Sequence, residues 1–147
     1  MASLPPVAIS EAELASRLRL VVTRLARRLR TQLPGEVSPS QLAALSSVER
    51  LGPLTLGELS NTERVKPPTM TKIVACLEEQ GLVSRTIDEK DRRVARVRAT
   101  RAGLRFLEES RQQKDAYLAE RLRSLPAADR AALERAADVL ERLLEES

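Results

Sequence analysis

Histidine is absent from the 147-residue sequence, and Cys76 is its only cysteine. Without histidine the chain cannot form a serine–histidine or cysteine–histidine catalytic pair, nor a zinc site that needs imidazole. A single cysteine excludes a disulfide within the chain. Carboxylates could still bind magnesium, but no cluster of them stands out. We therefore predict that the protein is not an enzyme and that it needs no metal or other cofactor.

Long apolar runs are missing as well. No stretch approaches the roughly 20 apolar residues that span a bilayer. The N-terminus, MASLPPVAISEAELASRL, lacks both the basic start and the apolar core of a secretory signal. Hydrophobic residues nevertheless make up 42% of the chain and charged residues 31%, which is typical of a folded protein. Because the chain has the length of one ordinary domain, we expect a single-domain, cytoplasmic protein with no membrane partner.

Positive charge is concentrated in the middle of the chain, although the formal net charge is only +4. Residues 61–105 contain eleven Arg or Lys against six Asp or Glu, whereas residues 106–147 contain seven against ten. Residues 1–60 are close to balanced, with seven against five. A basic segment followed by a mildly acidic tail suggests a polyanion as partner.

Capping motifs and helical periodicity predict six helices. Ser10, Ser38 and Thr55 are each followed three positions later by Glu or Gln, which is the capping-box spacing of a helix start. Pro34 and Gly35 are expected to break the first helix. Two strand-like segments, GLVSRTI and RVARVRA, are joined by DEKDRR and predict a β-hairpin. The expected order is four helices, the hairpin and two further helices, starting near residues 10, 38, 55, 67, 101 and 126.

The fourth helix has two contrasting faces. Met70, Ile73, Val74 and Leu77 recur at helical spacing on one side, and Pro68, Thr71, Lys72 and Ala75 lie on the other. A short helix, a tight turn and a second helix with a polar outer face match the helix-turn-helix plan, whose second helix can enter the major groove. The threonines offer hydroxyls and methyls, the lysine offers a cation, and the helix dipole favours phosphate at this end. We predict that Pro68, Thr69, Thr71 and Lys72 face DNA.

The arginine-rich hairpin predicts a second contact with the duplex. A strand-turn-strand segment beside a helix-turn-helix can lie against the adjacent minor groove, where negative potential favours an inserted arginine. Arg96 and Arg98 share one face of the second strand. For these two residues, a solvated strand face and a phosphate contact are equally compatible with the sequence.

Three segments resemble the winged helix-turn-helix core of MarR-type transcriptional regulators: LSNTERVKPPTMTKIVACLEEQGLVSR, DEKDRRVARVRAT and the following RAG. The most specific parts are LEEQGLVSR, then Asp88, Asp91, Arg93 and the pair formed by Thr100 and Gly103. The resemblance covers nearly the whole chain. It implies a mainly helical fold with a small β-hairpin wing and six helices. It also implies a single domain over residues 1–147, with a DNA-binding lobe at 38–100 and a helical dimerisation region at 10–33 and 101–147.

The resemblance also implies a function and a set of roles. Members of this family form homodimers, bind near-palindromic double-stranded operators and release them on binding small, often phenolic, molecules. The recognition helix would run from Pro67 to Gln80. Arg93 corresponds to the wing-tip arginine, Asp91 to the carboxylate that braces it, and Arg92 to an additional backbone contact. The sequence differs from the family in its double proline and in its scarcity of aromatic residues.

Our hypothesis at this point is a dimeric, sequence-specific repressor that a small aromatic or phenolic effector releases from DNA. A non-specific architectural DNA-binding protein is the alternative, and an enzyme or a protein-binding adaptor comes third. Cys76 could suggest redox sensing. A structural role suits it better, because related oxidation sensors are expected to place their cysteine near the N-terminal helix.

Overall fold

Six helices and a three-stranded sheet make up the described part of the chain, residues 8–32, 35 and 37–146 of the computed structural model. The elements in chain order are α1 (Glu11–Arg30), α2 (Pro39–Leu51), β1 (Leu54–Thr55), α3 (Leu56–Glu63), α4 (Pro67–Glu79), β2 (Val83–Ile87), β3 (Ala95–Ala99), α5 (Arg101–Arg123) and α6 (Ala127–Glu145). The predicted mainly helical fold with six helices and a β-hairpin is confirmed. The strand β1 was not predicted. The helix break expected at Pro34 lies outside the described residues.

Helix starts follow the capping signals in the sequence. In all three predicted capping boxes, the serine or threonine side chain accepts from a backbone N–H three residues later, and the Glu or Gln side chain accepts from the backbone N–H of the capping residue. At the start of α5, the hydroxyl of Thr100 accepts a hydrogen bond from the backbone N–H of Gly103. These local bonds satisfy N–H groups that have no partner inside a helix.

β3 is the central strand of the sheet and pairs antiparallel with β1 on one side and β2 on the other. Val97 of β3 lies opposite Leu54 of β1 and Arg85 of β2. Val83 and Val97 are buried, whereas Ser84 and Arg98 are exposed. The sheet therefore has one face on the core and one face towards solvent.

The hydrophobic core lies in the lobe formed by α2, α3, α4 and the sheet. Its largest fully buried side chains are Leu45, Leu59, Met70, Val74, Leu77 and Val97. Burying a side chain of this size stabilises a fold by about 1.5–3 kcal/mol. Neither α1 nor α6 contributes a buried residue.

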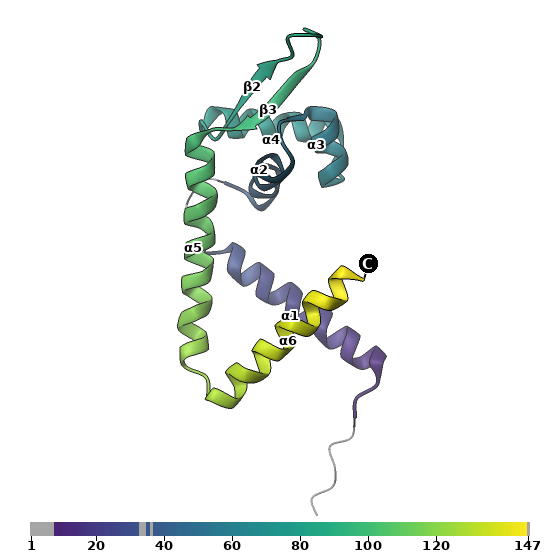
Figure 1. Ribbon diagram of the computed structural model, residues 1–147, viewed down its shortest axis with the longest axis vertical. Helices are drawn as coiled ribbons and strands as arrows, with labels where there is room; N and C mark the ends of the chain where they lie inside the picture. Colours follow the sequence, from purple (N-terminus) through teal and green to yellow (C-terminus); the bar gives the residue numbers. More distant parts are fainter. Residues whose placement is uncertain (1–7, 33–34, 36, 147) are drawn as a thin grey trace, which may run out of the picture.

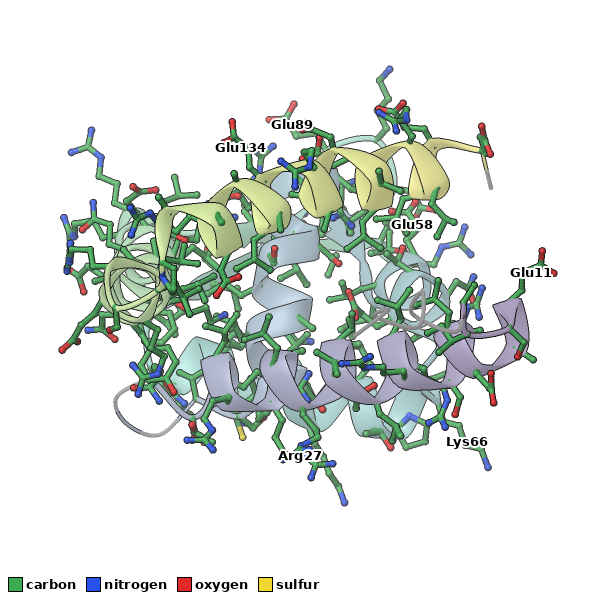
Figure 2. All side chains as sticks on the ribbon, turned by 90° about the horizontal axis from the view of Figure 1, so that it is seen from below. Glu11, Arg27, Glu58, Lys66, Glu89 and Glu134 are labelled. Carbon is green, nitrogen blue, oxygen red and sulfur yellow. The ribbon has the colours of Figure 1, made fainter. Side chains whose placement is uncertain are left out.

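The lobe stands at one end of the molecule, and α5 leads from it to the region of α1 and α6 at the other end (Figure 1). α1 and α6 cross in this view, but seen from below they lie apart (Figure 2). The two terminal helices therefore do not cover each other. No helix among the described residues combines the length and the apolar character that crossing a membrane requires.

Candidate nucleic-acid interface

The helix α4, which the sequence predicts to be the recognition helix, buries one face and exposes the other. Its buried residues are Met70, Ile73, Val74 and Leu77. All four residues predicted to face DNA, Pro68, Thr69, Thr71 and Lys72, are exposed. The structure thus brings them together on the outer face of α4, in the first turns after the helix-turn-helix turn. Their contact with DNA stays a prediction.

Residues 67–70, the first turn of α4, offer no free backbone donor to a phosphate. Pro67 and Pro68 have no N–H, and the N–H groups of Thr69 and Met70 both donate to the carbonyl of Lys66, at 3.0 and 3.1 Å. The Lys66 side chain makes no capping hydrogen bond. The expected attraction of the helix dipole for phosphate therefore lacks the N–H groups that normally deliver it. Phosphate binding at this end must come from side chains.

Thr71 uses its hydroxyl hydrogen within the helix. Its Oγ1 donates to the carbonyl of Pro67 at 3.0 Å. The methyl group and the remaining acceptor capacity of the oxygen are left for a base edge. Lys72, the next residue, is exposed and is the one cation among the four predicted contacts.

At the wing tip, Asp91 holds Arg93. The Nε of Arg93 donates to Oδ1 of Asp91 at 3.1 Å, and the backbone N–H of Arg93 donates to the same oxygen at 3.1 Å. These side-chain and backbone hydrogen bonds from Arg93 hold the pKa of Asp91 below its ordinary value. Nη2 of Arg93 also donates to Oδ2 of Asp91 at 3.4 Å. The Arg93 side chain nevertheless remains 91% exposed, so it is accessible to a partner. Its orientation relative to the tip is set by Asp91.

The wing tip has no net charge, although it is rich in arginine. Residues 88–93 contain three carboxylates and three cations. Asp88 is engaged within the tip: it accepts from the backbone N–H of Lys90 at 2.8 Å, which is the main reason that its pKa is lowered. Arg92 is exposed and forms no ion pair among the described residues. Contact with DNA would therefore depend on the directions of Arg92 and Arg93, not on the total charge of the tip.

Two ion pairs join the wing to the helices, and sequence reasoning found neither. Arg85 of β2 pairs with Glu78 of α4 at 2.6 Å. Arg96 of β3 lies 3.4 Å from Asp88 and 3.9 Å from Glu58 of α3. Arg96 is therefore held by carboxylates rather than freely solvated, whereas Arg98 on the same strand face is exposed. The partners are 7 to 38 positions apart, and no local pattern indicates such pairs.

The turn between α3 and α4 supplies two further cations. Arg64 and Lys66 are exposed on either side of the half-buried Val65. Neither residue was selected from the sequence, because their segment, NTERVK, has no periodicity and no glycine. Their position directly before α4 makes them part of the candidate interface.

Cys76 is half-buried on α4. Within the described residues, no group of three or more cysteine and carboxylate side chains could hold a metal ion.

The helices α2, α3 and α4 share one core, α4 exposes its outer face, and a β-hairpin lies beside it. This arrangement defines a winged helix-turn-helix protein. The family model described as MarR family matches residues 37–95. An HTH-type transcriptional regulator of Mycobacterium tuberculosis is 40% identical over 139 residues, covering 94% of this chain and 97% of the relative. The chain belongs to the MarR family. It is a DNA-binding transcriptional regulator and not an enzyme.

Solved structures agree with this assignment. A putative transcriptional regulator from Pseudomonas aeruginosa is 33% identical, with a TM-score of 0.81 over 91% of this chain and 95% of that one. A MepR mutant of Staphylococcus aureus bound to an oligodeoxyribonucleotide has a TM-score of 0.69 over 95% of this chain and the whole of that one. At 16% identity the second likeness concerns the fold alone.

Proposed function

We propose that the protein is a cytoplasmic, dimeric repressor that binds a near-palindromic operator and releases it when a small aromatic or phenolic molecule binds. The exposed outer face of α4 carries the proposal, because it combines short side chains with donors and acceptors suited to base edges. The residues proposed to contact DNA are Pro68, Thr69, Thr71 and Lys72 on α4, with Arg92 and Arg93 on the wing and Asp91 bracing. The recognition helix would read the major groove while the wing holds the adjacent minor groove.

Uncovered apolar side chains on α1 and α6 support the dimer. The exposed large hydrophobic residues include Leu14, Leu18, Val21 and Leu25 on α1, and Leu133, Val139 and Leu144 on α6. Neither helix buries a residue against its own chain, and apolar surface left uncovered in this way favours a partner. A second copy of the chain would bury both helices, with residues 10–33 and 101–147 as the dimerisation region and 38–100 as the DNA-binding lobe.

Charge complementarity favours the same partner. α1 carries six arginines against two glutamates, whereas α6 carries five carboxylates against three arginines. In a two-fold pair each basic α1 can lie beside an acidic α6 of the other subunit. Opposite charges at the rim of an apolar contact would fix its register.

Selection of bound fragments from the source genome tests the proposal. The selected fragments are expected to share a near-palindrome with half-sites about one helical turn, roughly 34–36 Å, apart. Sedimentation of the complex is expected to give two chains per duplex. Random-sequence duplex should compete poorly. Equal competition by random duplex would instead favour the architectural protein, and one chain per duplex would contradict the dimer.

A cavity of about 420 Å³ between α1, α2 and α5 supports an effector site. Leu29, Leu42 and Leu107 give it an apolar lining, and Ser110, Lys114 and Arg30 add polar groups. Because α1 belongs to the proposed dimerisation region and α2 to the DNA-binding lobe, a molecule bound here would touch both. It could therefore change the separation of the two recognition helices.

The chemistry of the cavity suits a small molecule with an apolar ring and an ionised acid group. The Ser110 hydroxyl is buried without a hydrogen-bond partner among the described residues. Burial, with further repulsion from Arg30 and Arg111, lowers the pKa of Lys114. A carboxylate or phenolate would accept a hydrogen bond from Ser110 and offset the repulsion among the cations.

We expect 4-hydroxybenzoate to raise the melting temperature and to weaken DNA binding, and the neutral 4-hydroxybenzamide to do neither at the same concentration. The variant Ser110→Ala should melt no lower than the native protein, because it removes an unpaired buried hydroxyl. Its affinity for the acid should fall about tenfold, measured by calorimetry. Equal binding of acid and amide, or unchanged affinity in Ser110→Ala, would contradict the proposed site.

A further inference from the structure

The turn of the helix-turn-helix carries an arginine in a backbone conformation that side chains rarely adopt. Arg64 has φ 53° and ψ 44°, in the left-handed region, and no other described residue except glycine has a positive φ. It ends α3 in a Schellman motif, in which the N–H of Val65 donates to the carbonyl of Ser60 at 3.0 Å. Glycine is the usual residue here, because a Cβ atom disfavours the left-handed region.

The same chain uses glycine for the same motif at the end of the next helix. Gly81 has φ 71°, and the N–H of Leu82 donates to the carbonyl of Leu77 at 2.9 Å. Both helices of the helix-turn-helix thus end in one geometry, with glycine after α4 and arginine after α3. Glycine would adopt the left-handed conformation with less strain than arginine at both helix ends. The presence of arginine at position 64 therefore indicates a role for its side chain.

No contact among residues 8–32, 35 and 37–146 explains it. Arg64 is exposed and forms no ion pair in the part of the chain that the structure describes. Glu63, its neighbour in sequence, is turned to α2, where it accepts a hydrogen bond from the hydroxyl of Ser47. Lys66 is likewise exposed and points away from the lobe (Figure 2). Two exposed cations without an ion pair among the described residues therefore lie directly before the start of α4.

This is also the point at which backbone donors are lacking. A helix start usually presents free N–H groups to a phosphate, but two prolines and the bond from Thr69 to the Lys66 carbonyl remove them here. We infer that Arg64, with Lys66, binds a backbone phosphate of the DNA beside the start of α4, in place of those N–H groups. This contact rests on the proposed function and adds an anchor that would set the position of α4 in the groove without reading sequence.

Arg64→Gly tests the inference, because stability and DNA binding should change in opposite directions. Relief of the left-handed conformation is expected to raise the melting temperature by about 2–4 °C. Affinity for a labelled mixed-sequence duplex of about 40 base pairs should fall several-fold at low salt. In a salt titration, the slope of log affinity against log salt should become shallower by about 0.9 for each phosphate that the variant no longer neutralises.

Gly81→Ala is the matched control for the backbone. An added Cβ there meets no atom within 4 Å, so the variant isolates the cost of a side chain at positive φ. It should melt lower than the native protein and bind the duplex unchanged. Arg64→Lys keeps the charge and should bind within about twofold of the native protein, because a phosphate contact needs a cation more than a particular shape.

If Arg64→Gly binds the duplex with unchanged affinity or an unchanged salt slope, Arg64 does not contact phosphate. The proposed function survives that result as long as Arg93→Ala still weakens binding. If the native protein binds no duplex at all, the proposed function and this inference both fail.

Discussion

Arg93→Ala is expected to weaken binding of the selected operator about 100-fold, or about 2.7 kcal/mol, with the fold intact. In the proposed dimer the change removes two arginines, one from each wing, at the groove where negative potential is strongest. The side chain is 91% exposed and its ion pair with Asp91 lies at the surface, so solvent screening leaves the pair with little effect on stability. The loss should therefore appear in binding and not in melting.

A fluorescence titration against operator and random duplex measures the effect. Arg123→Ala at the end of α5 is the matched control, because it removes the same charge from an exposed site outside the DNA-binding lobe and outside the two helices whose charges are proposed to meet in the dimer. It should bind within about twofold of the native protein, since screening weakens charges beyond roughly 10 Å at ordinary salt. Equal losses in both variants would mean that net charge, and not the wing, holds the DNA.

The sequence was informative where the deciding interactions are local. Capping boxes act over three residues, and the apolar spacing of α4 acts over one or two turns, so both can be read along the chain. The division of α4 into a buried and an exposed face follows from this spacing, and burial agrees with it at Met70, Ile73, Val74 and Leu77. The position of the four predicted contacts on the outer face follows from the same arithmetic.

Interactions between distant segments escaped prediction. β1 has two residues and exists because Leu54 pairs with Val97 of β3, 43 positions later. Arg96 was ambiguous in sequence because its neighbours could not reveal Asp88 and Glu58 on two other segments. The left-handed conformation of Arg64 depends on how α3 ends against α4. A sequence without glycine at that point gives no sign of it.

The terminal helices show a third kind of limit. The apolar stripes of α1 and α6 are visible in the sequence, but the sequence does not show whether residues of the same chain or of another chain bury them. The structure narrows the choice, because Leu14 and Leu25 of α1 remain 43% and 42% exposed and α6 buries no residue. In the proposed dimer, a second copy of the chain would bury these apolar faces. The dimer would also bring two outer faces of α4 into one assembly.

Gly103→Ala is expected to cause the largest loss of stability of any single methyl group added to this chain. Gly103 lies in the first turn of α5, and a Cβ there would stand 2.1 Å from the carbonyl oxygen of Leu82. That oxygen cannot move away freely, because it accepts a hydrogen bond from the N–H of Thr100 at 3.0 Å. The start of α5 is bound in turn, since the Thr100 hydroxyl donates to the carbonyl of Gly81 at 2.6 Å and accepts from Gly103.

Relief of the clash would require α5 to shift against the lobe that carries the recognition helix. We expect a loss of about 3 kcal/mol, at the upper end for overpacking, and a melting temperature lower by roughly 10 °C. Gly57→Ala makes the same chemical change in α3, where the nearest atom to the added Cβ, apart from chain neighbours, is Thr55 Oγ1 at 3.9 Å. It should stabilise by up to about 1 kcal/mol through helix propensity. Opposite signs in thermal melting would confirm the close packing of α5 on Leu82, and equal melting of the two variants would contradict it.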